Sequence, residues 1–141
     1  MCGLLTQKLN PMNTSEFKTM LHALAAGWQR RDYATVVSFF AEDVRYADPL
    51  RYSFENRQDL LAFFENDEGL EQSTVWHNMI FDEVQQVGVA EYTYDGTWCY
   101  HGTVWIRVQA GPDGVAKITH WREYQHTDPR EWEDFACGTA F

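Results

Sequence analysis

The sequence predicts one α+β domain, with helices in its N-terminal half followed by an antiparallel sheet. Apolar residues recur at helical spacing in the first half, whereas from Thr74 onward segments rich in β-branched and aromatic residues follow one another. Turn-forming residues separate these segments, most clearly in AGPDG at 110–114. The chain has 141 residues, 45% of them hydrophobic, which is enough for one core and leaves little room for a second domain.

Three segments predict helices, and a polar residue that can cap the N-terminus precedes each of them. Asn13 and Glu16 have the spacing of a capping box, in which each side chain accepts a hydrogen bond from the other residue's backbone N–H. Asp32 and Asn56 are the corresponding candidates for the second and third helices. The expected helices cover residues 14–30, 33–40 and 57–66.

Five segments predict strands, and one of them lies between the second and third helices. This early strand covers residues 44–48 and ends at Pro49, which has no N–H to donate to a sheet. The other four form an antiparallel meander over residues 74–84, 89–98, 103–109 and 115–125. We therefore expect the domain at 14–127, between an N-terminal extension at 1–13 and a C-terminal tail at 128–141.

Composition disfavours several classes of function. The formal net charge is -10, so the protein repels the phosphates of nucleic acids and the headgroups of anionic membranes. The sequence has neither an apolar run long enough to span a membrane nor a signal-peptide pattern, and we expect a cytoplasmic protein. Cys2, Cys99 and Cys137 are too scattered for a metal site, and no glycine-rich phosphate loop occurs, so we expect no metal and no cofactor.

Two stretches near the ends of the predicted domain resemble a known superfamily. GWQRRDYATVVSFFAEDVRYADP at 27–49 and GVAKITHWREYQH at 114–126 are similar to the opening and the final strand of NTF2-like proteins, in particular the SnoaL-like branch. The resemblance implies a cone in which three N-terminal helices pack on a strongly curved, mixed but mainly antiparallel sheet. The open end of such a cone is a small-molecule site, although the superfamily includes isomerases, polyketide cyclases, epoxide hydrolases, dehydratases and non-catalytic binders.

The resemblance extends to some residues of the limonene-epoxide-hydrolase-like members. Tyr46 and Asp48 occupy the slot of their early Tyr-x-Asn pair, and Glu123 occupies the slot of the carboxylate in their final strand. Their middle-strand Arg-x-Asp pair has only Thr93-Tyr94-Asp95 as its nearest match, so the arginine is missing.

Ketosteroid-isomerase-like members are matched at one position. Asp48 precedes Pro49 as their catalytic base does. The position of their tyrosine oxyanion donor is Leu24, and that of their second carboxyl group lies near Thr103. Neither side chain can perform those roles, which disfavours a ketosteroid isomerase of the usual type.

Asp48, Glu123 and Tyr46 are therefore the candidate catalytic residues. Asp48 and Tyr46 share one face of a strand, and an aromatic pocket there raises the pKa of a carboxyl group toward values useful for acid/base catalysis. We expect Asp48 to act as the base, Glu123 as the assisting acid and Tyr46 as a positioning group. The alternatives are that Asp48 caps the turn at Pro49 and that Glu123 faces solvent.

Six further residues are candidates for binding the substrate. They are His77, Trp98, Trp105, Trp121, Asp95 and Trp28. A buried histidine is more often part of the core, Asp95-Gly96 is a hairpin-turn signal, and tryptophans on a half-buried sheet are more often core than pocket.

The sequence thus predicts a protein that binds a small apolar molecule, either as a cofactor-free isomerase, cyclase, dehydratase or hydrolase, or as a non-catalytic ligand-binding or dimerisation domain. Exposed edge aromatics and the apolar tail at 135–141 favour a homodimer.

Overall fold

The computed structural model describes residues 11–139 and 141, so Cys2 and most of the predicted N-terminal extension lie outside the described residues. The helices and strands of the described part are α1 Thr14–Arg30, α2 Tyr33–Val37, β1 Phe40–Asp48, β2 Tyr52–Phe54, α3 Arg57–Glu65, β3 Ser73–Asp82, β4 Val87–Asp95, β5 Cys99–Ala110, β6 Ala116–Thr127 and α4 Trp132–Ala136. The strands form one sheet in the order β2-β1-β6-β5-β4-β3. Strands β1 and β6 are parallel and the other neighbours are antiparallel, which confirms an α+β fold with a mixed sheet.

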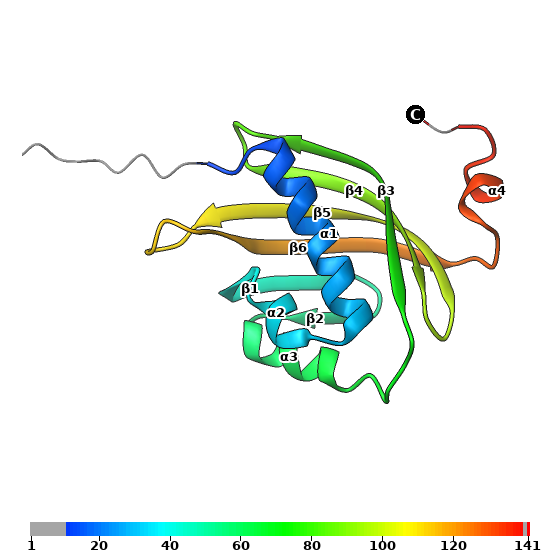
Figure 1. Cartoon of the computed structure of the whole chain (residues 1–141), viewed down its shortest axis with the longest axis horizontal. Helices are drawn as coiled ribbons and strands as arrows, with labels where there is room; N and C mark the ends of the chain where they lie inside the picture. Colours follow the sequence, from blue (N-terminus) through cyan, green and yellow to red (C-terminus); the bar gives the residue numbers. More distant parts are fainter. Residues whose placement is uncertain (1–10, 140) are drawn as a thin grey trace, which may run out of the picture.

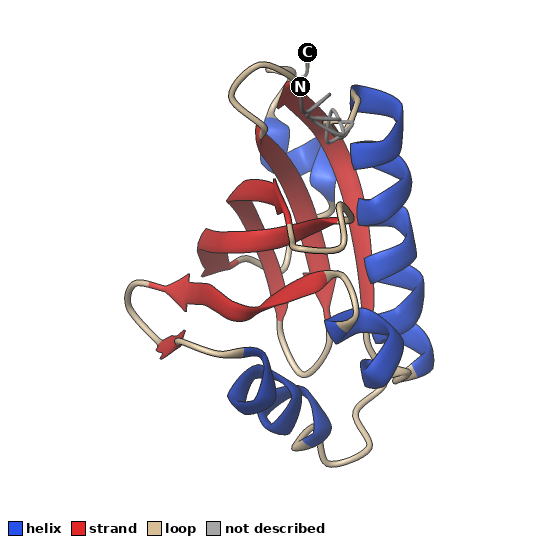
Figure 2. Cartoon of the chain, turned by 90° about the vertical axis from the view of Figure 1, so that its left-hand side faces the viewer, coloured by secondary structure: helices blue, strands red, loops and turns tan. Residues whose placement is uncertain are grey.

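Helix α1 lies across the curved sheet and covers one of its faces, which we call the inner face (Figures 1 and 2). The predicted capping box is present at its N-terminus. The ring of Phe17 stacks on Phe81 of β3 with 4.6 Å between centroids, and the indole Nε1 of Trp76 donates a hydrogen bond to the carbonyl of Leu21 at 2.7 Å. Helices α2 and α3 lie beside β1 and β2 at one side of the sheet (Figure 1).

The second helix is shorter than the sequence predicts, because α2 ends at Val37 and β1 already begins at Phe40. Phe40 has helical spacing from Tyr33, yet it is fully buried opposite Ile118 of β6. The backbone N–H of Ile118 donates to the carbonyl of Phe39 at 2.8 Å. Pairing with β6 therefore overrides the helical periodicity of this segment.

Two elements of the described chain were not predicted. Strand β2 has only three residues, too few for an alternating pattern, and it forms because the turn after Asp48 returns the chain along β1. Helix α4 has five residues, and its N-cap residue Glu131 makes no capping hydrogen bond with its side chain, so the usual start signal is missing. The described chain consequently has four helices and six strands where three and five were expected.

The inner face has an apolar end and a polar end. At the apolar end, a side chain on Gly88 of β4 would collide with Phe17, since its Cβ atom would lie 2.3 Å from the ring. Val108 is completely buried there. Toward the other end of the same strands, the inner face instead presents Tyr92 and Glu123. The glycine permits close packing at the first end, whereas the second contains the polar groups described below.

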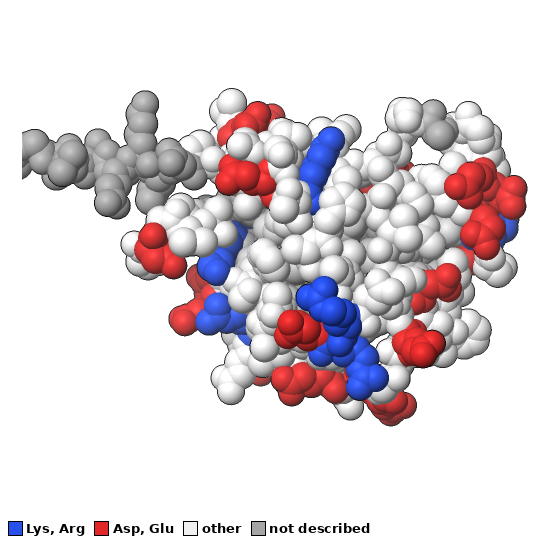
Figure 3. Space-filling view, viewed as in Figure 1, with Lys and Arg blue, Asp and Glu red and all other residues white. Residues whose placement is uncertain are grey.

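Charged side chains of both signs are interspersed on the face of the molecule in Figure 3. Over the described residues, no helix combines the length and the apolar character that crossing a membrane requires.

Candidate functional site

The polar end of the inner face contains a cavity of about 300 Å³. This volume is at the lower end of the range typical of small-molecule sites. Trp28 of α1 and Phe64 of α3 line it from the helical side, while Tyr46, Trp121 and Glu123 line it from the sheet. The walls are therefore largely aromatic, with the carboxyl group of Glu123 on the sheet side and the charged residues Arg51 and Asp67 also in the lining.

Glu123 reaches the cavity because Trp121, Glu123 and Gln125 alternate along β6 and all face inward. Its side chain is 6% exposed. Tyr52 donates a hydrogen bond to Oε1 of this carboxyl group, and Tyr92 donates one to Oε2 at 2.9 Å. Burial raises the pKa of Glu123 above its usual value, although these two donors oppose the shift by favouring the charged form.

The tyrosines around Glu123 remain protonated. Burial is the largest cause that raises the pKa of Tyr46, Tyr52 and Tyr92, and the negative charge of Glu123 raises them further. The ring of Tyr46 is held in place by stacking on Trp121, with 5.5 Å between centroids and 5° between planes. The site therefore offers hydroxyl donors around the carboxyl group of Glu123.

Gly102 of β5 makes room for one of these donors. A Cβ atom at this position would lie 2.7 Å from the phenol oxygen of Tyr92 and 2.9 Å from Gln125. Without a side chain there, Tyr92 reaches both Glu123 and Gln125. Gly102, Tyr52, Tyr92 and Gln125 were not among the predicted site residues, although the inward register of β4 and β6 was a signal for Tyr92 and Gln125.

Asp48 lies behind the cavity and does not line it. The carboxylate is 4% exposed and accepts hydrogen bonds from the backbone N–H of Leu50 at 3.0 Å and from Gln125 Nε2 at 3.2 Å. Arg51 Nε lies 3.8 Å away. Asp48 thus caps the turn at Pro49, which was the alternative interpretation of this residue, and it contacts the site through Gln125 and through Arg51, which lines the cavity.

The indole Nε1–H of Trp121 is a buried donor without a hydrogen-bond partner among the described residues. It lies near Glu123 and helps to lower the pKa of that carboxyl group, although the two do not meet hydrogen-bond geometry. A buried donor without a partner is costly to the stability of the fold.

A second polar group closes the cavity at its rim. Gln72 donates to the carbonyl of Trp28 at 3.2 Å and to the hydroxyl of Tyr33 at 2.8 Å, and it accepts from Tyr94 at 2.7 Å. Tyr33 in turn donates to Asp67. These bonds connect the segment after α3 to α1, α2 and β4. Sequence patterns gave no signal for them, because the partners lie far apart in the chain.

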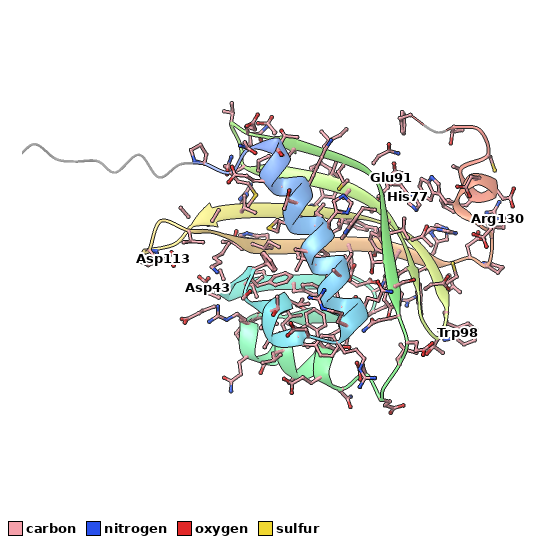
Figure 4. The ribbon with its side chains drawn as sticks, viewed as in Figure 1. Asp43, His77, Glu91, Trp98, Asp113 and Arg130 are labelled. Carbon is pink, nitrogen blue, oxygen red and sulfur yellow. The ribbon has the colours of Figure 1, made fainter. Side chains whose placement is uncertain are left out.

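Four of the six predicted binding residues lie elsewhere. His77 points to the outer face of the sheet, where its ring stacks on Trp132 of α4 at 3.8 Å (Figure 4). Trp98 is 62% exposed at the tip of the β4–β5 hairpin (Figure 4). Trp105 is 47% exposed on the outer face. Asp95 is exposed at the end of β4. These four residues are not part of the cavity lining, because strand register and the hairpin turn direct them away from it.

The remaining predicted residues do line the cavity, namely Tyr46, Glu123, Trp28 and Trp121. In the part of the chain that the structure describes, no three His, Cys, Asp or Glu side chains are grouped so that they could hold a metal ion. Cys99 and Cys137 are free thiols.

Neither a protein-family model nor a curated protein matches the sequence. Solved structures do. An LEH-like epoxide hydrolase of M. tuberculosis is 18% identical, with a TM-score of 0.63 over 77% of this chain and 80% of that one. A candidate ketosteroid isomerase of Kribbella flavida is 16% identical, with a TM-score of 0.65 over 86% and 87% of the two chains. An NTF2-like protein of unknown function from Burkholderia xenovorans is 14% identical, with a TM-score of 0.67 over 87% and 91%.

The chain has the NTF2-like fold. This confirms the resemblance found in the sequence at the level of the fold. Among proteins that share the NTF2-like fold, the site residues differ, so function must be argued from the cavity of this chain.

Proposed function

We propose that the protein binds a small, largely apolar molecule in the cavity and transfers a proton without a cofactor, with Glu123 as the acid/base group. The observation that carries this proposal is the buried carboxyl group of Glu123 at an aromatic cavity, with its pKa raised by burial. A carboxyl group whose pKa lies closer to neutrality is better suited to both accepting and returning a proton. This moves the role of base from Asp48 to Glu123.

Isomerisation illustrates the chemistry. Glu123 removes a proton from a carbon next to a carbonyl group of the ligand, and the electron pair of the broken C–H bond moves toward the carbonyl oxygen. Tyr46 lines the same cavity and its hydroxyl stays protonated, so it can donate to that oxygen. Glu123 then returns the proton to another carbon. Cyclisation, dehydration and addition of water move protons between other atoms, but each also needs a group that accepts a proton and gives one back.

The epoxide hydrolase and the candidate ketosteroid isomerase that share this fold are consistent with such chemistry. The differences limit the analogy. The middle-strand arginine of limonene-epoxide-hydrolase-like members is missing from this chain. Leu24 stands at the position where ketosteroid-isomerase-like members have their tyrosine donor. The proposal therefore names proton transfer and a ligand class, and leaves the reaction within that group open.

A non-catalytic binding protein is the second candidate, and one observation favours it. The carboxyl group of Glu123 already accepts hydrogen bonds from Tyr52 and Tyr92. A group held in this way can serve as a fixed polar end of a binding site, which orients a ligand without reacting with it.

A ligand screen followed by substitution separates these candidates. Terpenoid, steroid and aromatic polyketide libraries would be screened by native mass spectrometry and thermal shift, and each binder tested for conversion. For a converted ligand, we expect Glu123→Gln to lower kcat by roughly 10²- to 10⁴-fold while binding is largely kept. Asp48→Asn should cost less, and the exposed Asp95→Asn is the control that should change nothing.

Full turnover in Glu123→Gln would contradict the catalytic role. Ligands that bind the wild-type protein tightly and are never converted would instead favour the second candidate.

Self-association is a separate part of the proposal. The outer face of the sheet exposes Val75, Ile80, Trp105 and Tyr124. Large apolar side chains on one sheet face are typical of an interface, and we infer a homodimer formed through this face. The tail contributes less than expected, because Phe135 already stacks on His101 of its own chain at 4.3 Å. Light scattering of Trp105→Glu should give a monomer, and an unchanged mass would contradict the interface.

A further inference from the structure

The hydroxyl of Tyr92 has one hydrogen and two acceptors. Its oxygen lies 2.9 Å from Glu123 Oε2 and 2.9 Å from Gln125 Oε1. A tyrosine hydroxyl donates one hydrogen bond and can accept another. Tyr92 therefore donates to only one of these oxygens at a time, and the choice depends on whether Glu123 carries a proton.

Asp48 fixes the orientation of the Gln125 amide. The carboxylate of Asp48 faces donors, namely the backbone N–H of Leu50 at 3.0 Å and Arg51 Nε at 3.8 Å. Gln125 completes this set by donating from Nε2 at 3.2 Å. Because a carboxylate only accepts, the NH₂ group of the amide must point to Asp48. The amide oxygen is thereby directed at Tyr92.

Two hydrogen-bond patterns follow from this arrangement, one for each protonation state of Glu123. When Glu123 is ionised, Tyr52 donates to Oε1 and Tyr92 donates to Oε2. When Oε2 carries a proton, Glu123 donates to the oxygen of Tyr92, and Tyr92 turns its own hydrogen to Gln125 Oε1. In the protonated state every group of this chain of hydrogen bonds has a partner, whereas in the ionised state Gln125 Oε1 loses the hydrogen of Tyr92, so the arrangement favours the protonated form of Glu123.

We infer that Gln125, oriented by Asp48, is a positioning residue that stabilises the protonated form of Glu123 through the hydroxyl of Tyr92. This deepens the proposed function, on which its relevance to turnover rests, since a proton-transfer group must be stable both with and without its proton. Asp48 then acts two residues away from the reacting atoms, as the residue that keeps the Gln125 amide from turning over.

Other groups around Glu123 influence its pKa without taking part in the hydrogen bonds between Gln125 and Tyr92. Tyr46 of β1 and Tyr52 of β2 stay protonated, and the negative charge of Asp48 adds a small Coulombic contribution that also raises the pKa of Glu123. Trp28 and Phe64 face the cavity from the helices and carry no titratable group, whereas Arg51 and Asp67 are charged residues of the lining. The inference therefore requires a test that separates hydrogen bonding from charge.

Titration of Glu123 in the ligand-free protein provides this test. The ¹³Cδ signal of Glu123 is assigned from its loss in Glu123→Gln and followed by NMR from pH 3 to 9. In Gln125→Met the protonated state leaves Tyr92 without an acceptor, so the midpoint should fall by about one pH unit. The apolar methionine side chain would by desolvation raise the midpoint of Glu123, so the direction of the observed shift distinguishes the two effects.

A second glutamine of the cavity serves as the matched control. Gln72 lies at the rim and is bonded to Tyr33 and Tyr94 instead of Tyr92. Gln72→Met should leave the midpoint of Glu123 in place. An unchanged or raised midpoint in Gln125→Met, or an equal fall in both variants, would overturn the inference.

The role of Asp48 is tested with a double-mutant cycle. Asp48→Asn should lower the midpoint, because the Gln125 amide is then free to turn its NH₂ group toward Tyr92. In the Gln125→Met background, the same substitution should retain less than half of that shift. If the whole shift persists, Asp48 acts through its charge and its positioning role is wrong.

Tyr92→Phe keeps the test possible if Gln125→Met folds poorly. In the wild-type background, Gln125→Asn should lower the midpoint of Glu123, because the shorter side chain no longer reaches Tyr92. In the Tyr92→Phe background, which lacks the hydroxyl, the same substitution should leave the midpoint unchanged. An equal shift in both backgrounds would contradict the inference that Gln125 acts on Glu123 through the hydroxyl of Tyr92. These titrations need no substrate, so they can fail while the catalytic proposal stands, and the reverse also holds.

Discussion

At one end of the inner face Phe17 stacks on Phe81 between completely buried aliphatic side chains, whereas at the other end three tyrosines surround the buried carboxyl group of Glu123. The same strands build both ends. The first end gains stability from close packing, and it leaves no polar group to satisfy. The second end keeps a cavity, a charged group and an indole donor without a partner, all of which cost stability. Such a division is typical of a protein that binds a ligand at its less stable end.

The largest expected effect is on the apolar end. Phe17→Ala removes a completely buried ring and should lower the free energy of unfolding by about 4 kcal/mol. Denaturant unfolding measures this loss. The titration midpoint of Glu123 should stay where it is in the variant, and a shift would show that the two ends are not independent.

A pair of glycine substitutions compares the two ends directly. Gly88→Ala places a Cβ atom against the ring of Phe17, and Gly102→Ala places one against Tyr92. Each should cost about 2 kcal/mol, because the neighbouring ring must move. Only Gly102→Ala should shift the titration midpoint of Glu123, since it displaces the Tyr92 hydroxyl that is hydrogen-bonded to this carboxyl group. Equal titration curves for the two variants would count against this arrangement of the site.

A smaller effect concerns the dependence of stability on pH. Burial raises the pKa of Glu123 in the folded state, so the folded protein binds a proton at this residue more tightly than the unfolded chain does. The resulting contribution to the free energy of unfolding is fully present below the pKa of glutamate in the unfolded chain. This stability is lost as the pH rises through the folded pKa. Glu123→Gln removes this dependence, so the variant should be more stable than the wild type by about 1 kcal/mol at pH 8. Thermal unfolding across pH checks this, and the advantage should shrink at pH 4.

Much of the fold could be predicted because it depends on local patterns. The bounds of α1 follow from a capping box and an apolar stripe, and the meander follows from alternating residues between turns. Strand β2 and helix α4 could not be predicted, because each is too short to form by its own propensity and depends on partners distant in the chain. Phe40 was assigned to a helix for a related reason, since only its pairing with β6 makes it part of a strand.

The site was predictable in part. Glu123 and Trp121 could be placed by alternation along the final strand together with the family resemblance. The exclusion of Asp48 from the cavity depends on the path of the turn at Pro49, which sequence spacing alone does not define. The network of Tyr52, Tyr92 and Gln125 depends on strand register across the sheet, and no pattern within one strand reveals it.

The central claim is that Glu123 is a carboxyl group poised for proton transfer at the polar end of the sheet. The most direct measurement is the ¹³Cδ titration of Glu123 in the wild-type protein without ligand. The midpoint should lie above about 4.3, the ordinary value for glutamate, and above the midpoints of the exposed glutamates of the same chain. A midpoint at or below theirs would contradict the claim.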